Sequence, residues 1–114
     1  NTWYGDNDTT VKRVTTGHIE VTNGSPFLAA RTYTSAIEIW TVIFGTTSTR
    51  LYLNGALFAS GSSASFALSN VSLAQGFGEV DFSDFFVFNR ELSDYDRKLL
   101  ENYLRSKHQI TLLV

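Results

Sequence analysis

The clearest structural signal in the chain is the run Arg50-Leu51-Tyr52-Leu53-Asn54-Gly55-Ala56-Leu57-Phe58-Ala59. Two segments of alternating apolar residues flank Asn54-Gly55, and this pair is preferred in two-residue type I′ turns because both turn positions need positive φ. The run therefore predicts a β-hairpin, in which Asn54 and Gly55 have a structural role.

Short apolar runs separated by turn residues extend to both sides of the hairpin, a spacing typical of a sandwich or barrel. Ala36–Phe44 is apolar on both faces and is expected to be an interior strand. The longest expected strand is Val80–Phe88. The remaining strand candidates are Val11–Val14, His18–Val21, Phe27–Tyr33, Phe66–Leu68, Val71–Leu73 and Ile110–Val114.

The apolar period changes near the C-terminus, where we expect a helix from Asp94 to Lys107. Ser93 is the expected N-cap, with Asp96 three residues later in a near-capping-box arrangement. The apolar stripe expected to face the core consists of Tyr95, Leu99, Leu100, Tyr103 and Leu104. The side chains expected to face solvent are Arg97, Lys98, Glu101, Arg105 and Ser106.

Length and composition describe a single globular domain over residues 1–114. The absence of cysteine excludes a disulfide framework and thiolate metal sites. A net charge of -2 argues against nucleic-acid binding, which needs a basic surplus. The longest uncharged stretch, Leu51 to Leu73, is broken by turn residues, so no membrane span is expected. The chain begins with Asn1 and shows no leader, so we expect a processed product or a piece of a longer protein.

Three segments together carry a resemblance to a known family. They are Leu51-Tyr52-Leu53-Asn54-Gly55, then Asp84-Phe85-Phe86-Val87-Phe88-Asn89-Arg90-Glu91-Leu92-Ser93-Asp94, then Glu101-Asn102-Tyr103-Leu104-Arg105-Ser106-Lys107. In order and spacing, they resemble the second half of a concanavalin A-like lectin/glucanase domain of the laminin-G/pentraxin kind. The resemblance covers Ile37 to Leu112. It implies an all-β fold, a two-sheet antiparallel jelly-roll sandwich with one short C-terminal helix.

The chain departs from that family at its N-terminal side. The family usually has several more strands before the position of Ala36–Phe44, so this chain is either a reduced sandwich or is completed by a neighbouring chain, because an uncovered edge strand invites pairing. The acidic position that precedes the family's final strand motif corresponds here to Asp84.

One enzyme hypothesis comes from Glu79-Val80-Asp81-Phe82-Ser83-Asp84, which approximates the Glu-x-Asp-x-x-Glu pattern of related retaining glucanases. Retaining hydrolysis needs two carboxyl groups about 5–5.5 Å apart. Glu79 and Asp84 would lie on opposite faces of a regular strand. The structural alternative makes Asp84 a buried acid held by backbone groups or by Arg90. Catalysis by a serine or cysteine nucleophile is not supported, because the chain has neither the Gly-x-Ser-x-Gly motif nor a cysteine, and no histidine is identified as a base. We therefore assign no catalytic residue.

Two binding hypotheses concern the N-terminal region. Asp6 and Asp8 follow Gly5 in a loop and are candidate calcium ligands, since oxygen ligands suit a hard cation; an acidic turn is the alternative. Trp3, Tyr4 and Tyr33 are aromatic residues outside the expected core and are candidate glycan-binding residues, although Trp3 could equally be part of the core.

These observations predict a non-catalytic module that works outside a cell or on a virus particle, in adhesion, glycan binding or structural decoration of a phage tail, fibre or capsid. The expected partners are a cell-surface glycan or neighbouring subunits, including further copies of the chain. A calcium-dependent soluble lectin and a glucanase-like glycoside hydrolase are the alternatives.

Overall fold

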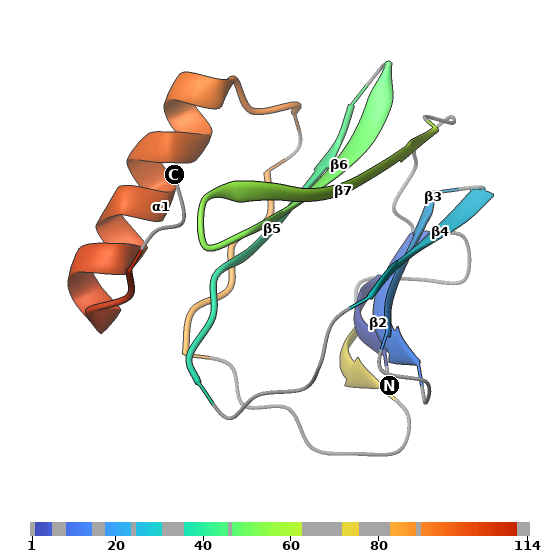
Figure 1. Cartoon of the computed structure of the whole chain (residues 1–114), viewed down its shortest axis with the longest axis horizontal. Coiled ribbons are helices and arrows are strands. Elements are labelled where there is room, and N and C mark those ends of the chain that lie inside the picture. Colours follow the sequence, from blue (N-terminus) through green and yellow to red (C-terminus); the bar gives the residue numbers. More distant parts are fainter. Residues whose placement is uncertain are drawn as a thin grey trace.

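The structure is a computed structural model of the whole chain (Figure 1). It describes the backbone of residues 2–5, 9–14, 18–23, 25–30, 36–45, 47–62, 72–75, 83–88 and 90–111. Side chains are described within 36–45, 47–61, 83–88 and 90–111.

A five-stranded antiparallel sheet contains the N-terminal strands. Its members are β1 (Thr2–Gly5), β2 (Thr9–Val14), β3 (His18–Asn23), β4 (Ser25–Ala30) and β8 (Ser72–Gln75), in the order β4-β3-β2-β1-β8. The strands predicted at Val11–Val14 and His18–Val21 are present and longer than expected. Pro26 lies in β4, a terminal strand of this sheet, where a residue without an N–H donor is tolerated.

A three-stranded antiparallel sheet follows, in the order β5 (Trp40–Phe44), β6 (Ser48–Leu53) and β7 (Ala56–Ser62). The predicted hairpin is confirmed, because β6 and β7 pair across a turn at Asn54 and Gly55 whose φ values are 47° and 89°. The Asn54 side chain also accepts a hydrogen bond from the Ile39 backbone N–H at 2.8 Å, and the Asn54 N–H donates to the Ile39 carbonyl. The turn is thereby tied to the chain just before β5.

The two faces of the three-stranded sheet are distinguished by strand register. Thr41 lies opposite Tyr52 and Ile43 opposite Arg50, so these four side chains share one face. The other face carries the pair formed by Val42 and the fully buried Leu51. Since central strand β6 is covered on both faces, it organises the described core.

The prediction of an interior strand at Ala36–Phe44 is wrong. The strand is shorter, Trp40–Phe44, and it is a terminal strand of its sheet. Trp40, Val42 and Phe44 are half-buried rather than buried, which fits that position. Apolar residues on both faces of a strand indicate that other parts of the protein pack on both faces of the sheet. They do not indicate that the strand has a hydrogen-bonded neighbour strand on each side.

The helix α1 (Asp94–His108) matches the predicted span to within one residue. Ser93 is the N-cap, and its Oγ accepts a hydrogen bond from the Asp96 N–H at 3.1 Å. The helix ends at Gln109, which adopts the left-handed conformation with φ 55°. In Figure 1, α1 lies beside the three-stranded sheet, on the side away from the N-terminal sheet.

The prediction of a two-sheet jelly-roll sandwich is wrong for the described residues. α1 lies against the Thr41–Tyr52 face of the three-stranded sheet, where a sandwich would place a second sheet. The segment 83–88 is not a strand, and Phe85, Phe86, Val87 and Phe88 are all exposed, so neither face of it is buried. Ile110 and Thr111 are not in a strand either. On its Thr41–Tyr52 face, the three-stranded sheet is therefore covered by a helix where the jelly-roll prediction expected a sheet.

The predicted strand Phe66–Leu68 lies outside the described residues, whereas β8 overlaps the predicted strand Val71–Leu73. Among the described residues, no helix has the length and apolar character needed to cross a membrane.

Candidate functional site

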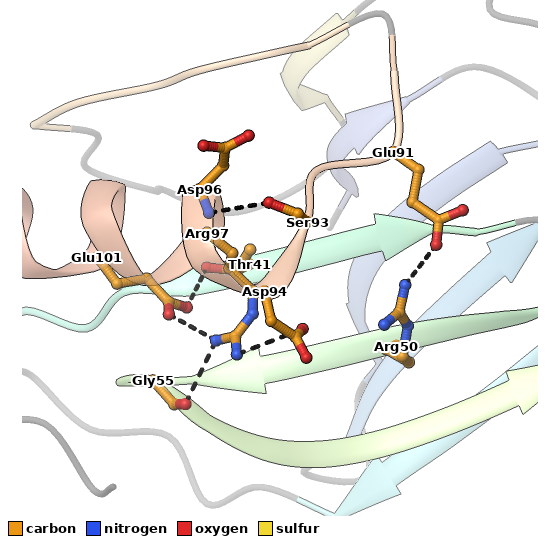
Figure 2. A network of polar contacts seen from close by, with 9 residues as sticks. All are labelled: Thr41, Arg50, Gly55, Glu91, Ser93, Asp94, Asp96, Arg97 and Glu101. Carbon is orange, nitrogen blue, oxygen red and sulfur yellow. Dashed lines mark hydrogen bonds and ion pairs between the residues drawn. The ribbon is translucent and has the colours of Figure 1, made fainter.

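The most tightly organised site of the described structure centres on Arg97, whose residue exposure is 4 %. Its Nη1 binds Glu101 Oε1 at 2.6 Å and lies 3.4 Å from the Gly55 carbonyl at the tip of the hairpin. The guanidinium carbon lies 3.8 Å from the centre of the Tyr52 ring. Figure 2 shows the guanidinium between Glu101 and Asp94, pointing from α1 to Gly55. We call the set of Arg97, Glu101, Thr41, Tyr52 and the Gly55 carbonyl the Arg97 clasp.

Glu101 completes the Arg97 clasp from the helix side with a residue exposure of 2 %. Its second carboxylate oxygen accepts a hydrogen bond from Thr41 Oγ1 at 2.9 Å (Figure 2). Burial raises the pKa of Glu101 above its ordinary value of 4.5, whereas the hydrogen bond from Thr41 and the charge of Arg97 act in the opposite direction. Both carboxylate oxygens are engaged, so Glu101 joins helix and sheet.

Local sequence explains why the parts of the Arg97 clasp meet. Arg97 and Glu101 are four residues apart in a helix, so they lie one above the other on one face. Thr41 and Tyr52 are directly opposite on β5 and β6, so they share the sheet face that α1 covers. The positive charge over the Tyr52 ring is a cation–π contact, which contributes about 0.5–2 kcal/mol. Arg97 Nε has no hydrogen-bond acceptor among the described residues.

A second polar cluster fixes the other end of the helix. Asp84 Oδ2 binds His108 Nε2 at 2.6 Å, and Asp84 Oδ1 accepts a hydrogen bond from Lys107 Nζ at 3.0 Å. An ionised carboxylate only accepts hydrogen bonds, so the contact between Asp84 and His108 requires a proton on His108 Nε2. The hydrogen bond with His108, followed by that from Lys107, lowers the pKa of Asp84 below its ordinary value of 3.8. The partners of Asp84 are thus residues of the last helical turn rather than Arg90, which instead pairs with Asp96.

Three apolar side chains of α1 face solvent, contrary to prediction, whereas Lys98, Arg105 and Ser106 are exposed as predicted. Tyr95, Leu99 and Tyr103 are 72 %, 51 % and 55 % exposed. They lie on successive turns, and we call them the outer stripe. Arg97 and Glu101, predicted to face solvent, occupy the buried face instead. Because residues two apart on a helix are separated by about 200° around its axis, burying the charged pair turns the outer stripe away from the sheet.

The polar groups of both sites attach α1 to the rest of the chain. In the Arg97 clasp, the charged groups bind each other, a hydroxyl and a carbonyl. In the second cluster, Asp84 binds two cationic or protonated side chains of the helix. Among the described residues, no group of three or more His, Asp or Glu side chains could hold a metal ion.

The side chains of the binding residues predicted from sequence lie outside the described part of the chain. Trp3 and Tyr4 lie in β1, where pairing with β2 shifts register between Thr2 and Tyr4, but their side chains are outside the described residues. Also outside the described residues are Asp6, Asp8, Tyr33, Glu79 and Asp81.

Sequence reasoning missed the buried role of Arg97 and Glu101. The available signal was their spacing of four residues on the helix, which equally describes an exposed ion pair. The sequence contained no signal for the positions of Thr41 and Tyr52, because the register of β5 on β6 brings them beside the helix.

Comparisons of the chain with protein-family models, with curated proteins and with solved structures found no match. The resemblance to concanavalin A-like domains stays a prediction based on the quoted motifs.

Proposed function

We propose that this chain is a non-catalytic binding and assembly module that works outside a cell or on the surface of a virus particle. The observation that carries the proposal is the outer stripe. Tyr95, Leu99 and Tyr103 are more than half exposed although they occupy successive turns of one helix. Grouped apolar side chains on a surface mark interaction sites, because their exposure to water is unfavourable unless another surface covers them.

The way α1 is attached supports this role. Arg97 and Glu101 hold the helix on the sheet through Thr41, Tyr52 and the Gly55 carbonyl. Asp84 holds its last turn through Lys107 and His108. A helix fixed at two places presents its outward face in a constant orientation. Rigid presentation lowers the entropic cost of binding, so the same contacts give higher affinity.

The polar sites support a non-catalytic role. The carboxylate of Glu101 is occupied by Arg97 and Thr41, and that of Asp84 by Lys107 and His108. Each carboxylate therefore has partners within the chain that give it a structural role, the attachment of α1.

The first test compares two leucines in thermal and urea unfolding. Leu99→Gln should change the free energy of unfolding by no more than about 0.5 kcal/mol, as expected at an exposed site. Leu51→Gln, at a fully buried site, is the matched control and should cost several kcal/mol, about 2–5, because it creates a cavity and buries an unpaired amide. If Leu99→Gln destabilises the chain as much as Leu51→Gln, the outer stripe is part of the core and the proposal fails.

The second test measures ligand binding and catalysis directly. The chain is melted with calcium, with chelator and with a panel of soluble glycans, while its mass in solution is recorded. A ligand that binds the folded state raises the melting temperature by mass action. Incubation with soluble glucans should release no reducing ends. Release that disappears in Glu79→Gln would overturn the non-catalytic assignment.

A further inference from the structure

The turn at Asn54 and Gly55 has a chemical reactivity that its structural role does not use. In an Asn-Gly pair, no side chain shields the nitrogen that follows asparagine, because glycine has no Cβ. That nitrogen can attack the side-chain amide of the asparagine. The chain contains a second Asn-Gly pair, Asn23-Gly24, so the same sequence chemistry is present at two positions.

The reaction is a deamidation whose only co-reactant is water. The Gly55 nitrogen forms a bond to Asn54 Cγ and gives up its proton, while the bond from Cγ to Nδ2 breaks and ammonia leaves. The product is a five-membered succinimide ring. Water then opens the ring at one of its two carbonyl groups. The residue becomes aspartate or isoaspartate, and in isoaspartate the main chain runs through Cβ and Cγ.

The closed turn prevents this reaction. Its φ values of 47° at Asn54 and 89° at Gly55 are those of a type I′ turn, in which ψ of the first turn residue is about 30°. At that ψ, Asn54 Cβ lies nearly opposite the Gly55 nitrogen about the Cα–C bond. Ring closure needs the two atoms on the same side of this bond, so the turn must first open by rotation about it.

Three contacts hold the turn in its unreactive conformation. Asn54 Oδ1 accepts a hydrogen bond from the Ile39 N–H at 2.8 Å, and the Asn54 N–H donates to the Ile39 carbonyl at 2.9 Å. The Gly55 carbonyl lies 3.4 Å from Nη1 of Arg97. Because Ile39, Gly55 and Arg97 are all buried, water competes little for these contacts.

We propose that Asn54 is a modification site controlled by the Arg97 clasp, and that it deamidates only while Arg97 has released Gly55 and the turn is open. The clasp thereby keeps a reactive asparagine intact. The fraction of modified chains measures how often the hairpin tip separates from α1. This control acts at the turn and is distinct from the binding role proposed for the outer stripe.

The two products differ in their effect on the hairpin. Aspartate keeps an acceptor oxygen for the Ile39 N–H, and Asp-Gly also favours a type I′ turn, so the turn closes again. Isoaspartate adds one atom to the main chain between β6 and β7, and a two-residue turn no longer joins them in register. It therefore keeps the turn open and separates the Gly55 carbonyl from Arg97.

The experiment follows deamidation of the full chain in mildly alkaline buffer by peptide mass mapping, with electron-transfer fragmentation to distinguish aspartate from isoaspartate. In guanidinium chloride, Asn54 and Asn23 should react at rates within a few-fold of each other, because both precede glycine. In the folded chain, Asn54 should react at least about tenfold more slowly than in denaturant, because only the open fraction reacts. Hydrogen exchange of the Asn54 amide should be slowed by a similar factor, since it also requires the turn to open.

Two variants test whether the clasp controls the reaction. Arg97→Met/Glu101→Leu removes the contact with Gly55 while the fold is expected to keep its stability. It should accelerate deamidation of Asn54 about two- to tenfold, the range that corresponds to one hydrogen bond. Thr41→Val removes the hydroxyl that binds Glu101, so it is a milder clasp variant and should act in the same direction. Circular dichroism checks that each variant is folded.

Gly45→Ala is the matched control, because it strains the turn between β5 and β6, at the opposite end of β6. It should leave the rate at Asn54 unchanged. The proposal is overturned if folded Asn54 reacts as fast as in denaturant, or if neither folded clasp variant changes its rate. Equal acceleration by Gly45→Ala and the clasp variants would also overturn it, because the site would then open through global unfolding.

Discussion

Removing the carboxylate of Glu101 is the sharpest perturbation of the Arg97 clasp. In Glu101→Ala, Arg97 remains on the buried face of α1 but loses the carboxylate oxygen that lies 2.6 Å from its Nη1. What remains near the guanidinium is the Gly55 carbonyl at 3.4 Å, the Tyr52 ring and the exposed Asp94 at 3.8 Å. A cation that is almost fully buried would then lack its close counterion.

The magnitude follows from the burial of both partners. Their side chains are 5 % and 2 % exposed, so solvent provides little screening. Breaking a buried ion pair by removing one partner costs about 3–5 kcal/mol, because the remaining charge is desolvated and uncompensated. Since the Tyr52 ring and Asp94 retain part of the compensation, we expect about 3 kcal/mol. At about tenfold for every 1.4 kcal/mol, that is more than a hundredfold in the unfolding equilibrium.

The assay is urea unfolding followed by tryptophan fluorescence and circular dichroism, with a double-mutant cycle over Arg97→Ala, Glu101→Ala and the pair. Both single variants should be strongly destabilised. The double variant should be much less destabilised than the sum of the singles, because neither charge is left alone. The apolar replacement Arg97→Met/Glu101→Leu should be neutral or stabilising, as at other buried ion pairs.

Two results would refute this reasoning. One is a cost below about 1 kcal/mol for Glu101→Ala, which is the range of solvent-exposed pairs. The other is additivity of the two single variants, which would show that the 2.6 Å contact contributes no coupling.

Three further predictions concern the attachment of the helix and the turn before β6. Wild type should have a higher free energy of unfolding than Asp84→Asn above pH 3.8, and this difference should disappear as the pH falls. The reason is that a carboxyl group with a lowered pKa stabilises the fold only while it is ionised. A difference that persists at the acid end of a urea–pH series would contradict the prediction. Ser93→Ala should cost about 1 kcal/mol in urea unfolding through loss of the bond to the Asp96 N–H, whereas Ser93→Asp, also a good cap, should restore it. Gly45→Ala should cost about 1–3 kcal/mol in the same assay, because the new Cβ would lie 2.7 Å from the Ser48 carbonyl oxygen; an unchanged midpoint would show that this turn relaxes freely.

Local features of the fold were predictable from sequence because their causes are local. The hairpin follows from the positive φ that Asn54 and Gly55 tolerate, and the start of the helix follows from the Ser93 hydroxyl and the Asp96 N–H. Neither depends on the rest of the chain. Strand pairing over longer distances was not predictable in the same way, which is why the sheet position of Ala36–Phe44 was wrong.

The buried face of the helix was wrong for a different reason. A prediction from apolar periodicity takes the more hydrophobic face of the helix to be the buried one. Here the sheet offers a carbonyl, a hydroxyl and an aromatic ring, at Gly55, Thr41 and Tyr52, and these groups satisfy Arg97 and Glu101. A polar pair with such partners can occupy a buried face. The partners, however, lie 42 residues away in the chain for Gly55 and Arg97 and 60 residues away for Thr41 and Glu101.

The Arg97 clasp also selects between two rotations of α1. Turning the helix by about half a turn would bury Tyr95, Leu99 and Tyr103 but would leave the Gly55 carbonyl and Thr41 hydroxyl facing an apolar surface, at an unpaired cost of about 1–3 kcal/mol each. On this hypothesis, Arg97→Met/Glu101→Leu removes the groups that specify the rotation while it keeps or raises stability. Iodide quenching of tyrosine fluorescence and amide exchange along the helix measure the result. A double variant in which Tyr95 and Tyr103 remain as accessible as in wild type would show that the backbone connection at Ser93 and the Asp84 contacts orient the helix without the buried pair.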